Sequence, residues 1–268
     1  MKLATNTIHP FIVVGLENII ASCILFFLSR NRKPIVFIRK NIYEIATQAF
    51  LLLVFGVGLI IISIRNLPAG MSAVVASSIP IWVLIFNALF YKKAPNFKLT
   101  IFVLSGFGGL ILLVFKSFDS SEVQLKSILC LIVAIISWSY GLFRLPFLKI
   151  SKEPFMSSAG QTLISGLIYL MIALIAGNFS LAGSSNSSLI SLLLLSTLGS
   201  CLAFSSFNWL LRKVPSTVVS TYAYINPVIS LLVSYFYLNE TVTKYSLVGA
   251  LLVLLSVFFV IHFSRADL

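Results

Sequence analysis

Charged residues are scarce in this sequence. Only 10% of its 268 residues are charged and seven are acidic, whereas 59% are apolar and the mean hydropathy is +1.06. A soluble chain of this length has too little interior to hide so much apolar surface. The composition therefore excludes an ordinary soluble domain and points to lipid as the solvent for most of the side chains.

Cysteine and histidine are also rare. The three cysteines, Cys23, Cys130 and Cys201, lie far apart inside apolar runs, and the two histidines stand at the ends of such runs. Disulfide frameworks, metal sites and acid–base clusters need such residues close together. No GxxxxGKS or GxxxxGKT loop for nucleotide phosphates is present either. We therefore predict no metal, no cofactor, no catalytic residue and no enzymatic activity.

Long apolar runs are what the sequence has in abundance. Runs of about 20 residues match the length of a helix that crosses a bilayer, and a helix satisfies its own backbone in hydrocarbon. Nine such spans are predicted, at 9–29, 43–64, 68–91, 98–116, 125–147, 155–176, 187–210, 215–237 and 243–263. The predicted fold class is an all-α polytopic membrane protein, with the lipid bilayer as its partner.

Basic residues predict the orientation. One set of alternate loops, together with the C-terminal end, holds 14 of the 19 lysines and arginines, and cytoplasmic loops are the ones that carry such an excess. The C-terminus is therefore expected in the cytoplasm. The loop clusters also account for the charge of +12 without nucleic acid as a partner. The set comprises Arg30, Arg32, Lys33, Arg39, Lys40, Lys92, Lys93, Lys98, Arg144, Lys149, Lys152, Arg212, Lys213 and Arg265.

The second half of the chain repeats the pattern of the first. Residues 65–115 align on 212–262 at a constant offset of 147, which places Pro68 on Pro215 and Pro80 on Pro227. The same offset gives the span at 125–147 a partner just before the first residue. We therefore expect an inverted repeat of 1–120 and 121–268 with four spans against five, the first helix being missing.

Prolines and polar residues inside spans are the candidates for a solute pathway. Pro80 and Pro227 each remove a backbone hydrogen bond, either to bend a pathway helix or for packing alone. Polar side chains near them need partners in lipid, which a solute or a neighbouring helix supplies. The candidate pathway residues are Ser77, Ser78, Pro80, Trp82, Ser137, Trp138, Tyr140, Asn208, Tyr222, Tyr224, Asn226 and Pro227.

Glu17 is the acidic residue near the middle of a span. An ionised carboxylate there costs on the order of 3 kcal/mol on insertion scales, so it should be neutral, paired or hydrated. Three interpretations stay open: a proton-coupling group, a neutral acid bonded to another helix, or a carboxylate exposed by the missing helix. The glycine pairs Gly56–Gly58 and Gly106–Gly109 permit close helix packing within the chain or in a homodimer.

Three segments resemble the EamA type of the drug/metabolite transporter superfamily. They are NLPAGMSAVVASSIP (66–80), AIISWSYGLF (134–143) and LLRKVPSTVVSTYAYINPVISLLVSYFYLNETVT (210–243). The resemblance implies two EamA repeats, five plus five helices in the family and four plus five here. It implies a secondary transporter in the cell inner membrane, an exporter of small metabolites such as amino acids or drugs by alternating access. The alternatives are a lipid-linked carrier flippase and a truncated member that does not transport.

The sequence departs from that family at two informative positions. Glu17 stands where the family usually has an arginine, and Ser63 stands where it usually has an acid.

Overall fold

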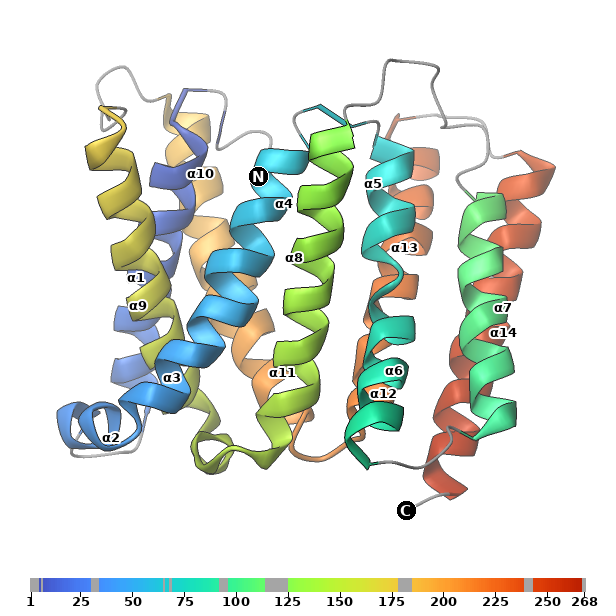
Figure 1. Cartoon of the computed structure of the whole chain (residues 1–268). Helices are drawn as coiled ribbons and strands as arrows, with labels where there is room; N and C mark the ends of the chain where they lie inside the picture. The colour runs from blue at the N-terminus through green and yellow to red at the C-terminus, as the bar shows by residue number, and fades with distance from the viewer. Residues whose placement is uncertain are drawn as a thin grey trace. The chain divides into compact units, whose positions relative to one another are not determined.

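The computed structural model of the chain describes residues 5, 7–29, 34–64, 66–67, 69–91, 96–113, 125–177, 185–238 and 243–266 (Figure 1). These residues form helices joined by turns, and no strand occurs among them, which confirms the predicted all-α class. The elements are α1 Pro10–Leu28, α2 Pro34–Lys40, α3 Ile42–Gln48, η2 Ala49–Val57, α4 Gly58–Ser63, α5 Ala69–Ala76, α6 Ile79–Tyr91, α7 Phe97–Leu113, α8 Leu125–Arg144, η4 Leu145–Phe147, η5 Lys149–Lys152, α9 Pro154–Ile175, α10 Asn186–Leu194, η6 Leu195–Ala203, α11 Phe204–Leu210, α12 Ser216–Ser220, α13 Tyr222–Leu238 and α14 Lys244–Ala266.

Seven helical segments in the described part of the chain are long and apolar enough to cross a membrane. They coincide with seven of the nine predicted spans. The other two are also helical: α7 is a shorter apolar helix of 17 residues, and α12 and α13 follow one another with a turn at Thr221. The seven are Pro10–Leu28, Ile42–Ser63, Met71–Tyr91, Leu125–Phe147, Pro154–Ile175, Asn186–Leu210 and Lys244–Ser264.

Local sequence signals explain where several helices begin and end. Pro10 and Pro154 occupy first-turn positions, where the missing N–H costs no helical hydrogen bond. Ser185 caps α10, because its Oγ accepts from the Ser188 N–H at 3.2 Å. Helix α9 ends at Ile175, and Gly177 in the turn that follows has a φ of +67°, which suits a residue without a Cβ.

The chain divides into two compact units. Unit 1 comprises residues 1–55 and 144–213, and unit 2 comprises 56–143 and 214–268. Each unit therefore combines helices from both halves of the sequence. The repeat limits of 1–120 and 121–268 describe the sequence pattern rather than these compact units, and they stay a prediction.

Unit 1 is built around α1 and α9, which run in opposite directions and form its most extensive contact (Figure 1). Small residues bring the two backbones together. A Cβ at Gly166 would lie 2.9 Å from Ile19 Cγ1 and 3.0 Å from the Gly15 carbonyl oxygen. Ser22 of α1 also donates to the Ala159 carbonyl at 2.9 Å. The pair is thus held by close packing and by a buried hydrogen bond.

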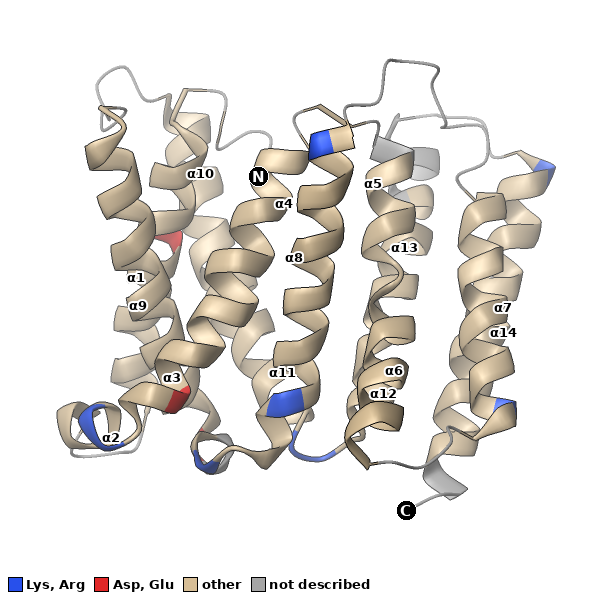
Figure 2. Ribbon diagram, in the orientation of Figure 1, with Lys and Arg blue, Asp and Glu red and all other residues tan. Residues whose placement is uncertain are grey.

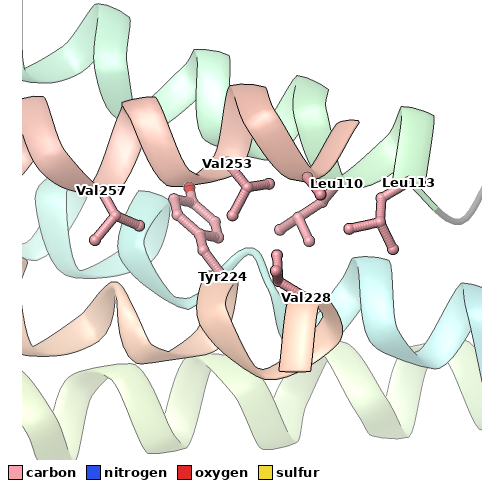
Figure 3. Packing of buried hydrophobic residues seen from close by; sticks show 7 residues of the cluster. Leu110, Leu113, Tyr224, Val228, Val253 and Val257 are labelled. Carbon is pink, nitrogen blue, oxygen red and sulfur yellow. The ribbon is translucent and has the colours of Figure 1, made fainter. Parts of the chain in front are cut away.

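Unit 2 is built in the same way around α7 and α14, which also run antiparallel (Figure 1). A Cβ at Gly109 would lie 2.9 Å from Leu252 Cβ and 3.0 Å from the Gly249 oxygen. Gly109 therefore belongs to the packing within the chain, one of the two uses left open for the glycine pair Gly106–Gly109. The adjoining core contains Leu110, Leu113, Tyr224, Val228, Ala250, Val253 and Val257 (Figure 3).

Close contacts between helices recur at residues that are related by the repeat offset of 147. Ile19 and Gly166 occupy equivalent positions and touch one another. The contact between Gly109 and Gly249 has its counterpart between the equivalent residues Ser256 and Phe102, which share a hydrogen bond. The packing within each unit therefore follows the offset of the sequence repeat, and the inverted repeat itself stays a prediction.

Two nine-residue π-helical stretches also recur at nearly this spacing. η2 begins at Ala49 and η6 at Leu195, which is an offset of 146. A π-helix leaves some carbonyls poorly satisfied. In unit 1 the Tyr169 hydroxyl donates to the Leu53 oxygen of η2 at 2.6 Å and approaches the Val54 oxygen at 3.2 Å.

Candidate functional site

A helix interruption in unit 2 lies at the first predicted proline. Helix α5 ends at Ala76, a turn covers Ser77 and Ser78, and α6 begins at Ile79. Pro80 thus sits in the first turn of α6 and is buried. The two serine hydroxyls bond to their own chain, Ser77 to the Ala73 oxygen at 2.6 Å and Ser78 to the Val75 oxygen at 2.7 Å.

The second proline lies in a different setting. Pro227 is inside α13, which continues through it, and the interruption of this span is at Thr221. A proline at 227 has no N–H to offer the carbonyl four residues earlier, that of Ala223. That carbonyl accepts instead from the Ser77 hydroxyl at 3.3 Å. The interrupted span of the first half therefore supplies a donor to the proline-containing span of the second.

The polar residues beside Pro227 face helix α8. The side chains of Tyr222 and Trp138 interact electrostatically, which brings two predicted pathway residues together. Ser137, the neighbour of Trp138, is partly exposed, as is Tyr222. Asn226 lies one helical turn beyond Tyr222 and is exposed.

An aromatic cluster joins α6 to α8 next to these residues. Tyr140 packs edge-on against Phe86 with ring centroids 5.3 Å apart, and Phe90 lies 5.9 Å away. Phe143 lies 5.1 Å from Phe90. Trp82 is a half-buried residue of α6. Such edge-to-face pairs hold the two helices at a defined distance.

Tyr224 occupies a different environment from the other predicted residues. It is fully buried in the core between α7 and α14, where its ring packs among Leu110, Val228 and Val253 (Figure 3). Its hydroxyl donates to the Val103 carbonyl oxygen at 2.8 Å. The structure therefore gives this side chain a packing partner on every side.

Glu17 belongs to unit 1, on the helix α1. Its Oε1 accepts a hydrogen bond from the Ser200 hydroxyl at 2.6 Å, and Ser200 lies in the π-helical stretch η6. Gly199 leaves room beside the carboxyl, because a Cβ there would lie 3.6 Å from Oε1. The acid thus faces the π-helical stretch η6.

Asn208 also belongs to unit 1, within a buried polar cluster that extends beyond the sequence prediction. Its Nδ2 donates to Ser158 Oγ at 2.6 Å, and Gln161 Nε2 donates to Ser157 Oγ at 2.8 Å. The oxygens Asn208 Oδ1 and Gln161 Oε1 are buried without a partner. Ser157, Ser158 and Gln161 were missed in the sequence, although the polar run Ser158, Thr162, Ser165 has helical spacing that could have marked this face.

Basic side chains lie at the helix ends within each unit (Figure 2). In unit 1, the end that carries α2 is also coloured for lysine and arginine. Along the chain, Arg144 ends α8, Lys149 lies in η5, and Arg212–Lys213 follow α11. In unit 2, Lys98 lies in the first turn of α7, and Lys126 and Lys244 lie in the first turns of α8 and α14. No group of three or more His, Cys, Asp or Glu that could hold a metal ion occurs in the described ranges.

Spans with interruptions, buried polar groups and basic ends define a polytopic membrane protein with the architecture of a solute transporter. The chain belongs to the EamA-like transporter family, whose profile matches residues 1–115 and 125–262. The family and the names of its relatives point to a transporter rather than to an enzyme.

Individual relatives agree with this assignment. The chain is 25% identical over 249 residues to the inner membrane transporter YedA of Escherichia coli strain K12, which covers 91% of this chain and 79% of that protein. It is 26% identical to a transporter encoded in the trpA 3′ region of Buchnera aphidicola subsp. Schlechtendalia chinensis, over 88% of this chain and 78% of that one. A protein crystal structure superposes with a TM-score of 0.81 at 14% identity, covering 98% of this chain and 91% of the other, and this likeness concerns the fold alone.

Proposed function

We propose that this protein is a secondary transporter that exports small metabolites, such as amino acids or drugs, across the cell inner membrane by alternating access. The observation that carries the proposal is the interrupted helix pair of unit 2. The turn at Ser77 and Ser78 and the hydrogen bond from Ser77 to Ala223 put unwound backbone and a proline-freed carbonyl side by side. Broken helices of this kind bind solutes in secondary transporters.

The proposed solute pathway includes the polar and aromatic residues grouped around that pair. Tyr222 with Trp138, Tyr140 with its aromatic neighbours, and the exposed Asn226 provide hydrogen-bonding groups and flat apolar surfaces. Small-molecule sites combine these two kinds of surface. Tyr224 is assigned a packing role, because its ring and hydroxyl are both occupied in the core. Asn208 belongs to unit 1, and its place among the pathway residues stays a prediction from the sequence.

Glu17 is proposed to couple transport to protons. A carboxyl within a span can carry one proton in the neutral form and release it where water enters. The hydrogen bond from the neutral hydroxyl of Ser200 supports an exchangeable carboxyl.

The proposed architecture is that of two EamA repeats, 1–120 and 121–268, with the C-terminus in the cytoplasm. The two stretches matched by the family profile, the antiparallel pairing of equivalent helices and the π-helical stretches at an offset of 146 support the repeats. The basic end of unit 1 supports the orientation, because positive residues accumulate in cytoplasmic loops. YedA is an inner membrane transporter by name, which supports the same location for this chain.

The test is transport by the purified full chain in proteoliposomes. Radiolabelled amino acids and cationic drugs are offered in counterflow, first without and then with a pH gradient. We expect counterflow of at least one solute, and an uptake driven by the gradient that Glu17→Gln abolishes while counterflow persists. Ser200→Ala is the matched control, because it removes the hydrogen bond and keeps the carboxyl.

The two parts of the proposal fail separately. Absence of counterflow for every solute of the panel, by a protein that is folded by circular dichroism, contradicts the transport proposal. Gradient-driven uptake that is unchanged in Glu17→Gln contradicts only the proton coupling.

A further inference from the structure

Helix α2 differs from every other helix of unit 1. Its seven residues rise about 10 Å, about a third of what a bilayer requires. Its axis lies across the ends of α1 and α9 rather than along them (Figure 1). The apolar residues Ile35 and Val36 nevertheless stand 79% and 59% exposed. A helix of this length and position lies at the membrane surface.

The exposed face of α2 combines apolar and basic side chains. Ile35 and Val36 occupy its first turn, and Arg39 and Lys40 follow four residues later on the same face. The opposite face, with Phe37 and Ile38, is partly buried. No acidic residue occurs within α2. The face therefore presents two alkyl side chains beside two positive charges.

The inner face fixes α2 on the rest of unit 1. Ile38 Cγ1 lies 3.8 Å from the position of a Cβ on Gly160 of α9. Asn41 Nδ2 donates to the Phe37 oxygen at 2.9 Å and holds the elbow between α2 and α3. The exposed face is consequently held in one direction and is not free to rotate inward.

The surrounding charges do not neutralise this face. Glu44, the acid on the next helix, accepts from the Ile150 N–H at 3.2 Å. That bond brings the segment with the exposed Lys149 to the same end of unit 1. Within the described ranges, neither Arg39 nor Lys40 forms an ion pair with an acid.

We propose that α2 is a binding site for anionic phospholipid headgroups. Ile35 and Val36 enter the boundary between headgroups and acyl chains, and Arg39 and Lys40 bind the phosphate groups. Charge complementarity selects the anionic lipid, because the phosphate of a zwitterionic lipid is neutralised by a positive group on the same headgroup. The bound lipid then also stabilises unit 1, because α2 is packed on α9.

The experiment measures thermal unfolding of the full chain in mixed micelles that contain phosphatidylglycerol or, at equal mole fraction, phosphatidylcholine. Phosphatidylglycerol is expected to raise the melting temperature by about 3 °C more, since a ligand of the folded state stabilises it. In Arg39→Gln/Lys40→Gln the half-saturating fraction of phosphatidylglycerol should rise about thirtyfold. Arg39→Lys/Lys40→Arg, which keeps both charges, should behave as the native chain.

Lys126→Gln/Lys244→Gln is the control, because it removes two exposed charges from unit 2 and leaves α2 intact. Retention of the phosphatidylglycerol response in this control supports a site at α2. An equal loss in both double variants, or no difference between the two lipids in the native chain, overturns the proposal.

A second measurement tests the position of α2 without using thermal unfolding or the charge variant. A nitroxide on Ile35→Cys, in a chain whose three cysteines are replaced by alanine, reports its depth in a bilayer through collisions with oxygen and with a polar nickel complex. Contact with the acyl boundary supports the proposal, and a fully aqueous label overturns it.

Discussion

At the scale of single residues, the hydroxyl of Ser77 links two spans of unit 2. It is buried, it stands at a helix interruption, and it is shared between the Ala73 and Ala223 oxygens. Pro227 creates the need for this donor, since it cannot supply the Ala223 carbonyl with an N–H. One serine therefore compensates for a proline 150 residues further along the chain.

Replacing Ser77 with alanine should destabilise the protein by about 1–2 kcal/mol, because a buried carbonyl loses its donor. Ser78→Ala is the matched control, since the Ser78 hydroxyl bonds only within its own turn. Unfolding in mixed detergent, followed by circular dichroism, measures both variants. Equal losses of stability would contradict the role assigned to the bond to Ala223.

The register of Pro80 and Pro227 could be read from the sequence, because proline acts through its own backbone. The hydroxyl acceptors could not be, since they depend on which carbonyls a neighbouring helix presents. The amides of unit 1 illustrate the same limit. The sequence indicated Asn208, because it is a polar residue within a span. The role of Gln161 follows only from the buried polar cluster around it.

At the scale of elements, helix pairing depends on individual glycines. Gly109 faces α14 and Gly108 faces open space, although the two are adjacent. Gly109→Ala should destabilise the protein by about 1–3 kcal/mol, because the new methyl group overlaps Leu252 and the Gly249 backbone. Gly108→Ala should be neutral or stabilising, since alanine is the better helix former. Melting temperatures that fall equally in the two variants would refute this packing.

The π-helical stretch η2 depends on Tyr169. Tyr169→Phe removes the hydroxyl that donates to the Leu53 oxygen and should cost about 1–2 kcal/mol. In the same variant, amide hydrogen exchange in residues 49–57 should become faster. Tyr43→Phe provides the control, because that ring is 76% exposed. An unchanged exchange pattern in Tyr169→Phe would show that η2 does not need this donor.

The sequence predicted spans more reliably than the details within them. Apolar runs placed the helices within a few residues, for example 155–176 against Pro154–Ile175. Hydropathy depends only on composition and length, so it did not detect the short α2 or the π-helical turns. It also could not tell that Thr221, rather than Pro227, interrupts the span predicted at 215–237.

At the scale of the whole molecule, orientation follows from the basic loops. A green fluorescent protein fused after residue 268 should fluoresce, because the C-terminus is expected in the cytoplasm. Alkaline phosphatase fused at the same place should be inactive, since it folds only outside. An active phosphatase fusion would reverse the predicted orientation.

The mixed origin of the two units has a consequence for biosynthesis. Helix α1 finds its main partner in α9, and α7 finds its partner in α14, each about 147 residues later. At about 5–20 residues per second, α1 waits roughly 7 to 30 s in the membrane before α9 is made. During that interval the Gly15 face of α1 and the carboxyl of Glu17 are without the α9 and η6 residues that they contact in the folded chain. The nascent first half is therefore the stage at which a membrane chaperone would act, well before either unit exists.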